Sequence, residues 1–439
     1  MRRFFLLIVF GLSFILTSCD SISIDELETY QSEQDYCTDD LSPLEHMGAL
    51  NAVKKAYQLT DIEFTPLNSI GYNLGSYQPN ASYTGMIYSS VKEIGTYVGS
   101  NVSFHTFMTA IHNPRSRIYT EKINHEPYHG TNCKAYYGTV CSDLVSYSLG
   151  LLPGYGSYDF PASSMMKEID HSNPDNIHIA DVMWRTGHVA IITDVKRNKR
   201  GKVCYIELSE AAQHGCRKRL LTRNGFERNM ESPYEKVFRY INLADNTDYT
   251  PATEFVSVLD EKASSYKYNE MICSDKGDKA NYLEGDKIVL NVFSPYKSLV
   301  VYKDGAIFSS YNGNDSFSDL TLTNLPYGNY YAEIVNNNGE TERTSWIVVN
   351  YYTSFNSKEN SIFFHSKNAD PFQAEICSKA GGRAYHPMTE IFNKVLSYDD
   401  VSSGRVDIPK ELMKDDCPYY QVMFKTEYGI ITTGPIKIK

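Results

Sequence analysis

A cysteine at a predicted helix start and a histidine at a predicted strand start are the side chains best placed for chemistry. Residues 140–149 predict a helix with one apolar face, and Cys141 lies in its first turn. At that place the helix dipole and the first N–H groups favour a thiolate. Residues 188–195 predict a strand that Gly187-His188 opens, and the imidazole can serve as a base. The pattern predicts that His188 activates a nucleophile, Cys141.

A third polar group is needed to orient the imidazole. Residues 203–209 predict the next strand, and a hairpin that closes around residues 196–202 would bring Glu207 and Ser209 near His188. Side chains two residues apart lie on the same face of a strand. Glu207 is therefore the first candidate and Ser209 the second. Glu210 is the third, because it lies on the other face unless a bulge intervenes.

The order of these motifs resembles the NlpC/P60 and CHAP superfamily of papain-like cysteine peptidases and amidases. Members carry Cys-Ser at a helix start, Gly-His-Val at a strand start and a polar residue on the following strand. The corresponding residues here are Cys141-Ser142, Gly187-His188-Val189 and Glu207 or Ser209. The resemblance covers about residues 120–215.

The resemblance implies a papain-like α+β domain that cleaves an amide bond, often next to γ-D-Glu, in peptidoglycan stem peptides or another peptide. It implies no metal and no organic cofactor. Tyr128 and Ser142 would bind the substrate, and the backbone N–H of Cys141 would help to hold the oxyanion. Val140 and Asp143 replace the family's usual Asp and Gly, beside the nucleophile where substrate contacts begin.

Other residues offer alternatives to this site. Residues 125–129 spell HExxH, the signature of zinc peptidases, but Pro127 interrupts the helix that would bring both histidines to one metal. No metal site is therefore predicted. Cys133 is an alternative nucleophile that lacks an apolar helix behind it, and Cys204 and Cys216 could pair across a loop. A transglutaminase-like fold also has the order Cys, His and acid, but it would prefer an Asp after the histidine strand.

The first residues predict export and membrane anchoring. A basic start and an apolar run over residues 4–16 end in Leu16-Thr17-Ser18-Cys19, which resembles the lipobox of bacterial lipoproteins. Residues 1–18 are therefore predicted to be a signal peptide, and Cys19 to carry the lipid. Residues 19–42 are acidic and predict a tether. The expected location is the bacterial cell envelope, anchored in the outer membrane and facing either the periplasm or the cell surface.

The rest of the chain predicts three domains. Residues 43–248 would form the NlpC/P60-like α+β domain with its N-terminal helical part. Strand-like runs separated by turn dipeptides such as Asp304-Gly305 and Asn312-Gly313 predict two immunoglobulin-like, all-β sandwiches, at 252–352 and 353–439. These sandwiches would be spacers or binding modules. A net charge of −11 argues against nucleic acid as a partner, because phosphates require clustered Lys and Arg.

A non-enzymatic surface-binding or adhesion lipoprotein is the competing hypothesis. It rests on the two predicted sandwiches, the 35 tyrosines and the residues that depart from the family pattern beside Cys141. The peptidase fold would then be degenerate, and Cys141 would react no faster than an ordinary thiol. The bond cleaved and the oligomeric state stay open at the level of sequence.

Overall fold

The computed structural model describes most of the chain from residue 43 onward. It does not describe residues 1–42, 73–74, 89–91, 94–95, 98–103, 121–136, 152–155, 213, 233, 246–267, 315–317, 368–373, 382–388, 414–418, 427–428, 433–435 and 438–439. The predicted signal peptide, Cys19 and the tether lie outside the described residues. Tyr128, Cys133 and the HExxH segment do so as well.

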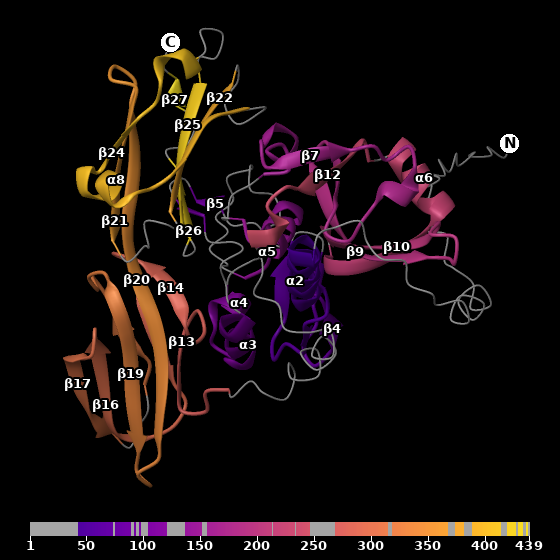
Figure 1. Cartoon of the computed structure of the whole chain (residues 1–439). Helices are drawn as coiled ribbons and strands as arrows, with labels where there is room; N and C mark the ends of the chain where they lie inside the picture. Colours follow the sequence, from indigo (N-terminus) through magenta and orange to yellow (C-terminus); the bar gives the residue numbers. More distant parts are fainter. Residues whose placement is uncertain are drawn as a thin grey trace, which may run out of the picture.

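A six-stranded antiparallel sheet forms the centre of the N-terminal part (Figure 1). Its strand order is β11-β10-β9-β8-β12-β7. The strands are β7 (Met166–Ile169), β8 (Val182–Arg185), β9 (His188–Arg197), β10 (Val203–Ala212), β11 (Gly215–Thr222) and β12 (Lys236–Tyr240). The predicted strands at 188–195 and 203–209 are thus present as β9 and β10, and they form the predicted hairpin.

Two helices cover one face of this sheet. They are α2 (Pro43–Thr60), in the predicted N-terminal helical part, and α5 (Cys141–Leu149), close to the helix predicted at residues 140–149. Proline is well suited to the start of α2, because it lacks the N–H that would have no partner in a first turn. Leu144 and Val145 of α5 pack into one core with Val189 and Ile191 of β9. Alternate residues of β9 therefore face the helices.

Helix α6 (Arg223–Glu231) covers the opposite face of the sheet. It begins after Thr222, whose hydroxyl accepts a hydrogen bond from the N–H of Gly225. Phe226 of α6 packs into a second core with Ala190 and Ile192 of β9.

The other elements of this part are β1 (Glu63–Phe64), β2 (Ile70–Tyr72), β3 (Gly75–Tyr77), β4 (Tyr83–Thr84), β5 (Lys92–Glu93), β6 (Thr96–Tyr97), α3 (Phe104–His112), α4 (Arg117–Thr120), η1 (Phe160–Ala162), η2 (Pro174–Asn176) and η3 (Leu243–Asp245).

The next part of the chain is a β-sandwich. One sheet holds β13 (Ile272–Ser274), β15 (Ile288–Val292) and β18 (Leu320–Leu322). The facing sheet holds β16 (Tyr296–Lys303), β17 (Ala306–Asn314), β19 (Gly328–Asn336), β20 (Thr341–Asn356) and, parallel to β20, β14 (Ala280–Leu283). Leu290, Val301 and Trp346 lie in the core between the sheets. Residues from both sheets thus alternate between a buried and an exposed side.

A second β-sandwich follows without a linker, because β20 continues into it. Its strands are β20, β21 (Ser361–Lys367), β24 (Arg405–Asp407), β22 (Glu375–Gly381), β23 (Thr389–Val395), β25 (Tyr419–Thr426), β26 (Gly429–Thr432) and β27 (Ile436–Lys437), with α8 (Tyr398–Ser403) and η6 (Lys410–Leu412). The predicted boundary between residues 352 and 353 therefore lies inside a strand. Tyr97 of β6 pairs with Ile430 of β26, so the N-terminal part also contributes to this sandwich.

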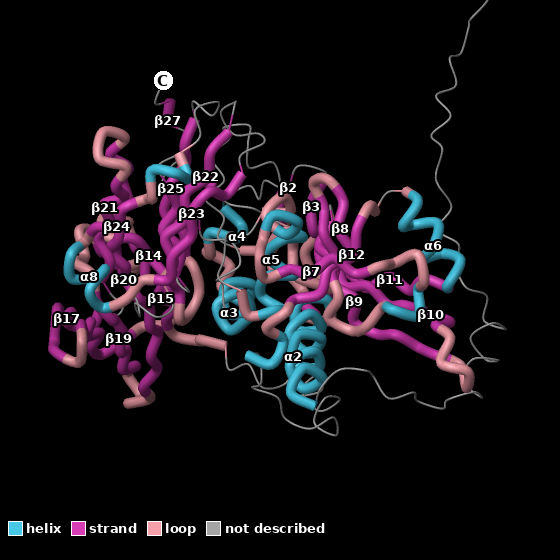
Figure 2. Tube along the Cα trace, turned by 45° about the horizontal axis from the view of Figure 1, so that its top comes forward, coloured by secondary structure: helices cyan, strands magenta, loops and turns pink. Residues whose placement is uncertain are grey.

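The described chain is mostly β-sheet, and the prediction of all-β sandwiches is confirmed. The helices gather in the N-terminal part, whereas the sandwiches consist almost wholly of strands (Figure 2). Asp304 and Gly305 have φ values of 51° and 84°, as expected for the predicted hairpin turn. The predicted turn at Asn312-Gly313 is wrong. Both residues lie inside β17, where Gly313 passes too close to the carbonyl oxygen of Tyr296 for any larger residue.

Candidate active site

Cys141 is the first residue of helix α5. Val140 before it is extended, with φ −111° and ψ 173°, and makes no side-chain cap hydrogen bond. Gly150 ends the helix with a left-handed φ of 70°, and its N–H donates to the carbonyl oxygens of Ser146 and Tyr147. Cys141 is 6% exposed. Its thiol therefore lies at the positive end of a buried helix.

His188 begins β9 directly after a tight turn. Thr186 and Gly187 connect β8 to β9, and the turn pairs Arg185 with His188. Gly187 has a φ of 79°, which glycine adopts without a steric penalty. The side chain of His188 is 13% exposed, so it is mostly shielded from water. The turn therefore fixes the imidazole at the end of a buried strand.

The thiol of Cys141 lies close enough to the imidazole of His188 to alter its protonation. Burial alone would disfavour the charged imidazolium. Hydrogen bonding and charge attraction to Cys141 and Glu210 outweigh burial and raise the pKa of His188 to about 9. An imidazolium at neutral pH is the counter-ion that a cysteine thiolate needs. The two residues can therefore form a thiolate–imidazolium pair.

The acid that contacts the imidazole is Glu210 of β10, which is 2% exposed. Its Oε2 lies 3.0 Å from Nε2 of His188. Its Oε1 accepts hydrogen bonds from Nε and Nη2 of Arg217, at 2.9 and 2.7 Å. The Tyr234 hydroxyl lies 3.3 Å from Oε2, and Nη1 of Arg219 lies 3.5 Å from Oε1. Burial opposes ionisation, but these partners lower the pKa of Glu210 to about 2, so it is a carboxylate at neutral pH.

Glu207 occupies a different place from the one that the sequence predicts. Its Oε1 accepts hydrogen bonds from the hydroxyls of Tyr57, at 2.7 Å, and Thr193, at 2.9 Å. Ser209 is 0% exposed, and its hydroxyl donates to Thr193 at 3.3 Å. The prediction that Glu207 or Ser209 contacts the imidazole is therefore wrong. The third-ranked candidate, Glu210, makes that contact.

The register of the hairpin explains this difference. Ile191 of β9 pairs with Ser209 of β10, so in this region even-numbered residues of both strands share one face. His188 and Glu210 therefore lie on the same face. A bulge at Thr193 adds one residue to β9, because Glu207 pairs with Asp194 while Leu208 pairs with Ile192.

Arg217, Arg219 and Tyr234 surround Glu210 and were not among the predicted site residues. Arg217 pairs directly with Glu210 across β10 and β11, and Arg219 follows two residues later on the same face. The alternation of Arg217-Lys218-Arg219 was the signal that could have found the two arginines. It becomes informative only once the register against β10 is known.

The other predicted residues have mixed outcomes. Ser142 follows Cys141 in α5 and is 7% exposed, and its substrate contact stays a prediction. Cys204 and Cys216 both carry free thiols, so they do not pair. Burial and the charge of Cys141 raise the pKa of Cys216 well above its usual value, so this neighbouring thiol stays protonated. Cys216 is therefore a poor nucleophile.

Metal ligands and membrane-spanning helices can be assessed for the described parts of the chain. There, no three His, Cys, Asp or Glu side chains gather in a way that could hold a metal ion. Among the helices described, none is long and apolar enough to cross a membrane.

Comparison with known proteins identifies no family. No family model matches the sequence, and no curated protein matches it. Among solved structures, the CD2-binding domain of CD58 is 9% identical, with 37% of this chain and 96% of that chain covered and a TM-score of 0.20. The 47-kilodalton lipoprotein Tp47 of Treponema pallidum is 11% identical, with 56% and 76% covered and a TM-score of 0.18. The fibronectin(III)-like modules of Clostridium thermocellum CbhA are 10% identical, with 38% and 90% covered and a TM-score of 0.17. Scores this low support no conclusion about fold or function.

Proposed function

We propose that this protein is a cysteine hydrolase that cleaves amide bonds. Cys141 is the nucleophile, His188 is the base and acid, and Glu210 orients His188. The observation that carries the proposal is the 3.0 Å contact between Glu210 and an imidazole that also meets Cys141. A buried carboxylate held by two arginines has little other reason to face a histidine beside a thiol at a helix start.

The geometry suggests how the reaction proceeds. Because Glu210 holds Nε2 of His188, Nδ1 is the ring nitrogen that can take the proton from Cys141. The thiolate attacks the carbonyl carbon, and N–H groups at the start of α5 stabilise the oxyanion. The imidazolium then protonates the leaving amine. Water attacks the thioester with His188 as base, which releases the acid and restores the thiol.

The arrangement supports the papain-like, NlpC/P60-type assignment that the sequence motifs suggest. A helix that starts with the cysteine packs on an antiparallel sheet, and neighbouring strands supply the histidine and the acid. We extend the proposal to an amide bond of peptidoglycan stem peptides as the substrate, with no cofactor. Lipidation of Cys19 would hold the enzyme at a membrane of the cell envelope, where this substrate occurs.

Cleavage of purified muropeptides, followed by mass spectrometry, tests the proposal. The wild-type protein should release a hydrolysed product, and Cys141→Ala should release none. Cys216→Ala is the matched control, because it removes a buried thiol near the site without removing the nucleophile. Equal product from wild type and Cys141→Ala would overturn the proposal.

A second candidate function is binding without catalysis. The low exposure of Cys141, 6%, favours it, because a substrate must reach the thiol. In that case Cys141 would react with iodoacetamide at the rate of an ordinary thiol throughout the neutral pH range. A fast reaction at pH 6–7 would favour the enzyme.

A further inference from the structure

One loop of the first β-sandwich makes several close contacts with the N-terminal part. Residues 275–279, called the docking loop here, connect β13 to β14 and contact helices α3 and α4. Gly277 has a φ of 105°, and a Cβ on it would lie 2.3 Å from the carbonyl oxygen of Thr106 in α3. Only glycine lets the loop approach the helix this closely.

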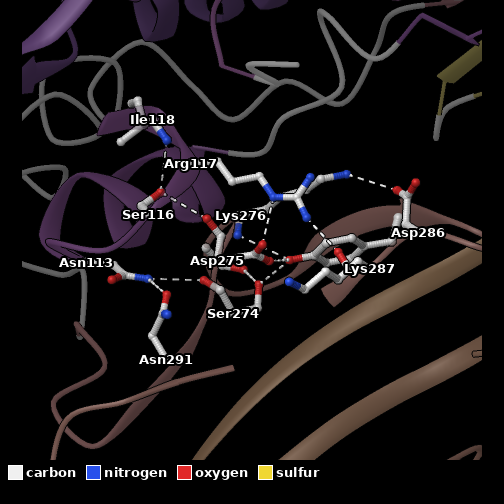
Figure 3. Close-up of polar contacts among 12 residues, drawn as sticks. Asn113, Ser116, Arg117, Ile118, Ser274, Asp275, Lys276, Asp286, Lys287 and Asn291 are labelled. Carbon is white, nitrogen blue, oxygen red and sulfur yellow. Dashed lines mark hydrogen bonds and ion pairs between the residues drawn. The ribbon is translucent and has the colours of Figure 1, made fainter. Parts of the chain in front are cut away.

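Polar groups on both helices bond to the docking loop. On α3, the Thr109 hydroxyl accepts from the N–H of Asp278 at 2.9 Å, and Nε2 of His105 lies 2.8 Å from the Asp278 carboxylate. On α4, Arg117 donates its N–H to the carbonyl oxygen of Asp275 at 2.8 Å and its Nε to the carboxylate at 2.7 Å (Figure 3). The loop is therefore held from both sides.

Much of this contact is buried, so its geometry is strictly defined. Asn113, 1% exposed, donates to the side chain of Asn291 in β15 at 2.9 Å (Figure 3). Ser116, 0% exposed, donates to the carbonyl oxygen of Asp275 at 3.1 Å. Lys276 is 2% exposed, and its ammonium lies 4.2 Å from the ring centroid of Tyr282. A satisfied buried network of this kind permits one arrangement of the two parts.

The docking loop also touches the segment that leads to the nucleophile. Tyr137 is 1% exposed, and its hydroxyl donates to the carbonyl oxygen of Lys276 at 2.8 Å. The same hydroxyl lies 3.3 Å from the Ser116 hydroxyl. Residues 138–140 alone separate Tyr137 from Cys141. Tyr137 therefore links the docking loop to the segment that enters α5.

We infer that the first sandwich positions the nucleophile, with Tyr137 as the positioning residue. The docking loop fixes Tyr137, and Tyr137 fixes the chain that enters α5 at Cys141. This role rests on the proposed function and goes beyond the prediction that the sandwich is a spacer or a binding module, which stays a prediction. Small displacements of a reacting group cost much rate, so a distant domain can control the site through one side chain.

Tyr137→Phe in the full chain tests this role. It removes the hydroxyl and leaves the ring in place. The readout is the rate at which iodoacetamide modifies Cys141 as a function of pH, measured by mass spectrometry of the peptide that contains Cys141. We expect the rate at pH 7 to fall roughly three- to tenfold and the midpoint to move to higher pH, because one buried hydrogen bond is lost.

Two glycines of the sandwich provide a matched pair of variants. Gly277→Ala places a methyl group against α3, whereas Gly285 has a similar φ of 94° and no atom within 4 Å of an added Cβ. Both variants place alanine at a positive φ, but only Gly277→Ala disturbs the contact between the docking loop and α3. We expect Gly277→Ala to move the pH profile of Cys141 as Tyr137→Phe does, and Gly285→Ala to leave it unchanged.

The outcomes separate this inference from the proposed function. If Cys141 of the wild type reacts as an ordinary thiol, the proposed function fails first. If the wild type is reactive and Tyr137→Phe retains its pH profile, the sandwich does not position the nucleophile and the inference is overturned. Should Gly277→Ala not fold, Tyr137→Phe alone decides, because it changes a single hydroxyl.

Discussion

Glu210→Gln keeps the shape of the side chain and removes the charge that faces His188. The pKa of His188 is about 9 with the carboxylate present. A hydrogen bond to a charged group contributes about 1.5–3 kcal/mol, which corresponds to about one to two pKa units. Arg217 and Arg219 would also lose their counter-ion and would disfavour the imidazolium further. The pKa of His188 should therefore fall to about 7–8 or below.

Glu210→Gln should therefore lower the equilibrium constant for forming the thiolate–imidazolium pair by roughly 10- to 100-fold. The assay is the pH dependence of iodoacetamide modification at Cys141, read by mass. Glu207→Gln is the matched control, because it removes a carboxylate on the same strand that bonds to Tyr57 and Thr193 instead. A profile that moves with Glu207→Gln and not with Glu210→Gln would refute the assignment of Glu210.

Two further predictions concern stability. The pKa of Glu210 is about 2 when folded against 4.5 when free, so its carboxylate stabilises the fold above pH 4.5 and this contribution, at most about 3 kcal/mol, is lost as the pH falls toward 2. Urea unfolding between pH 2 and 6 should therefore show a weaker acid dependence in Glu210→Gln than in wild type. Arg239 donates to both oxygens of Asp181, which is 0% exposed, at 2.7 and 2.8 Å. Arg239→Met should lower the free energy of unfolding by about 3–5 kcal/mol, and a loss below about 1 kcal/mol would contradict the importance of this buried pair.

Much of the fold could be predicted from the sequence, because it follows from local patterns. An apolar face and a glycine just after it predict helix α5, which the structure contains. Two apolar runs around a polar turn predict the hairpin of β9 and β10, which is also present. The domain boundary at 352/353 was not predictable in the same way. Strand β20 runs through it, and no glycine, proline or charge cluster in the sequence distinguishes one long strand from two short ones.

The candidate nucleophile and base could be predicted from their local settings, but the acid that contacts His188 could not. Cys141 and His188 are each defined by the element that they begin. Identification of the acid requires the register of a hairpin, and a shift of one residue moves every side chain to the other face. Glu207, Ser209 and Glu210 lie within four positions of one another, so the register alone decides among them.

Val140 stands where the NlpC/P60 and CHAP superfamily, which the sequence resembles, usually has an Asp, and it directly precedes Cys141. It occupies the N-cap of α5, where Ser, Thr, Asp or Asn usually accepts a hydrogen bond from the first turn. Val140 makes no such bond, which costs the helix about 1 kcal/mol compared with a capping residue. No side chain at this position then competes with a thiolate on Cys141 or with a substrate oxyanion for the N–H groups of the first turn. The loss of helix stability is therefore consistent with a helix start that serves catalysis, as functional sites commonly sacrifice local stability.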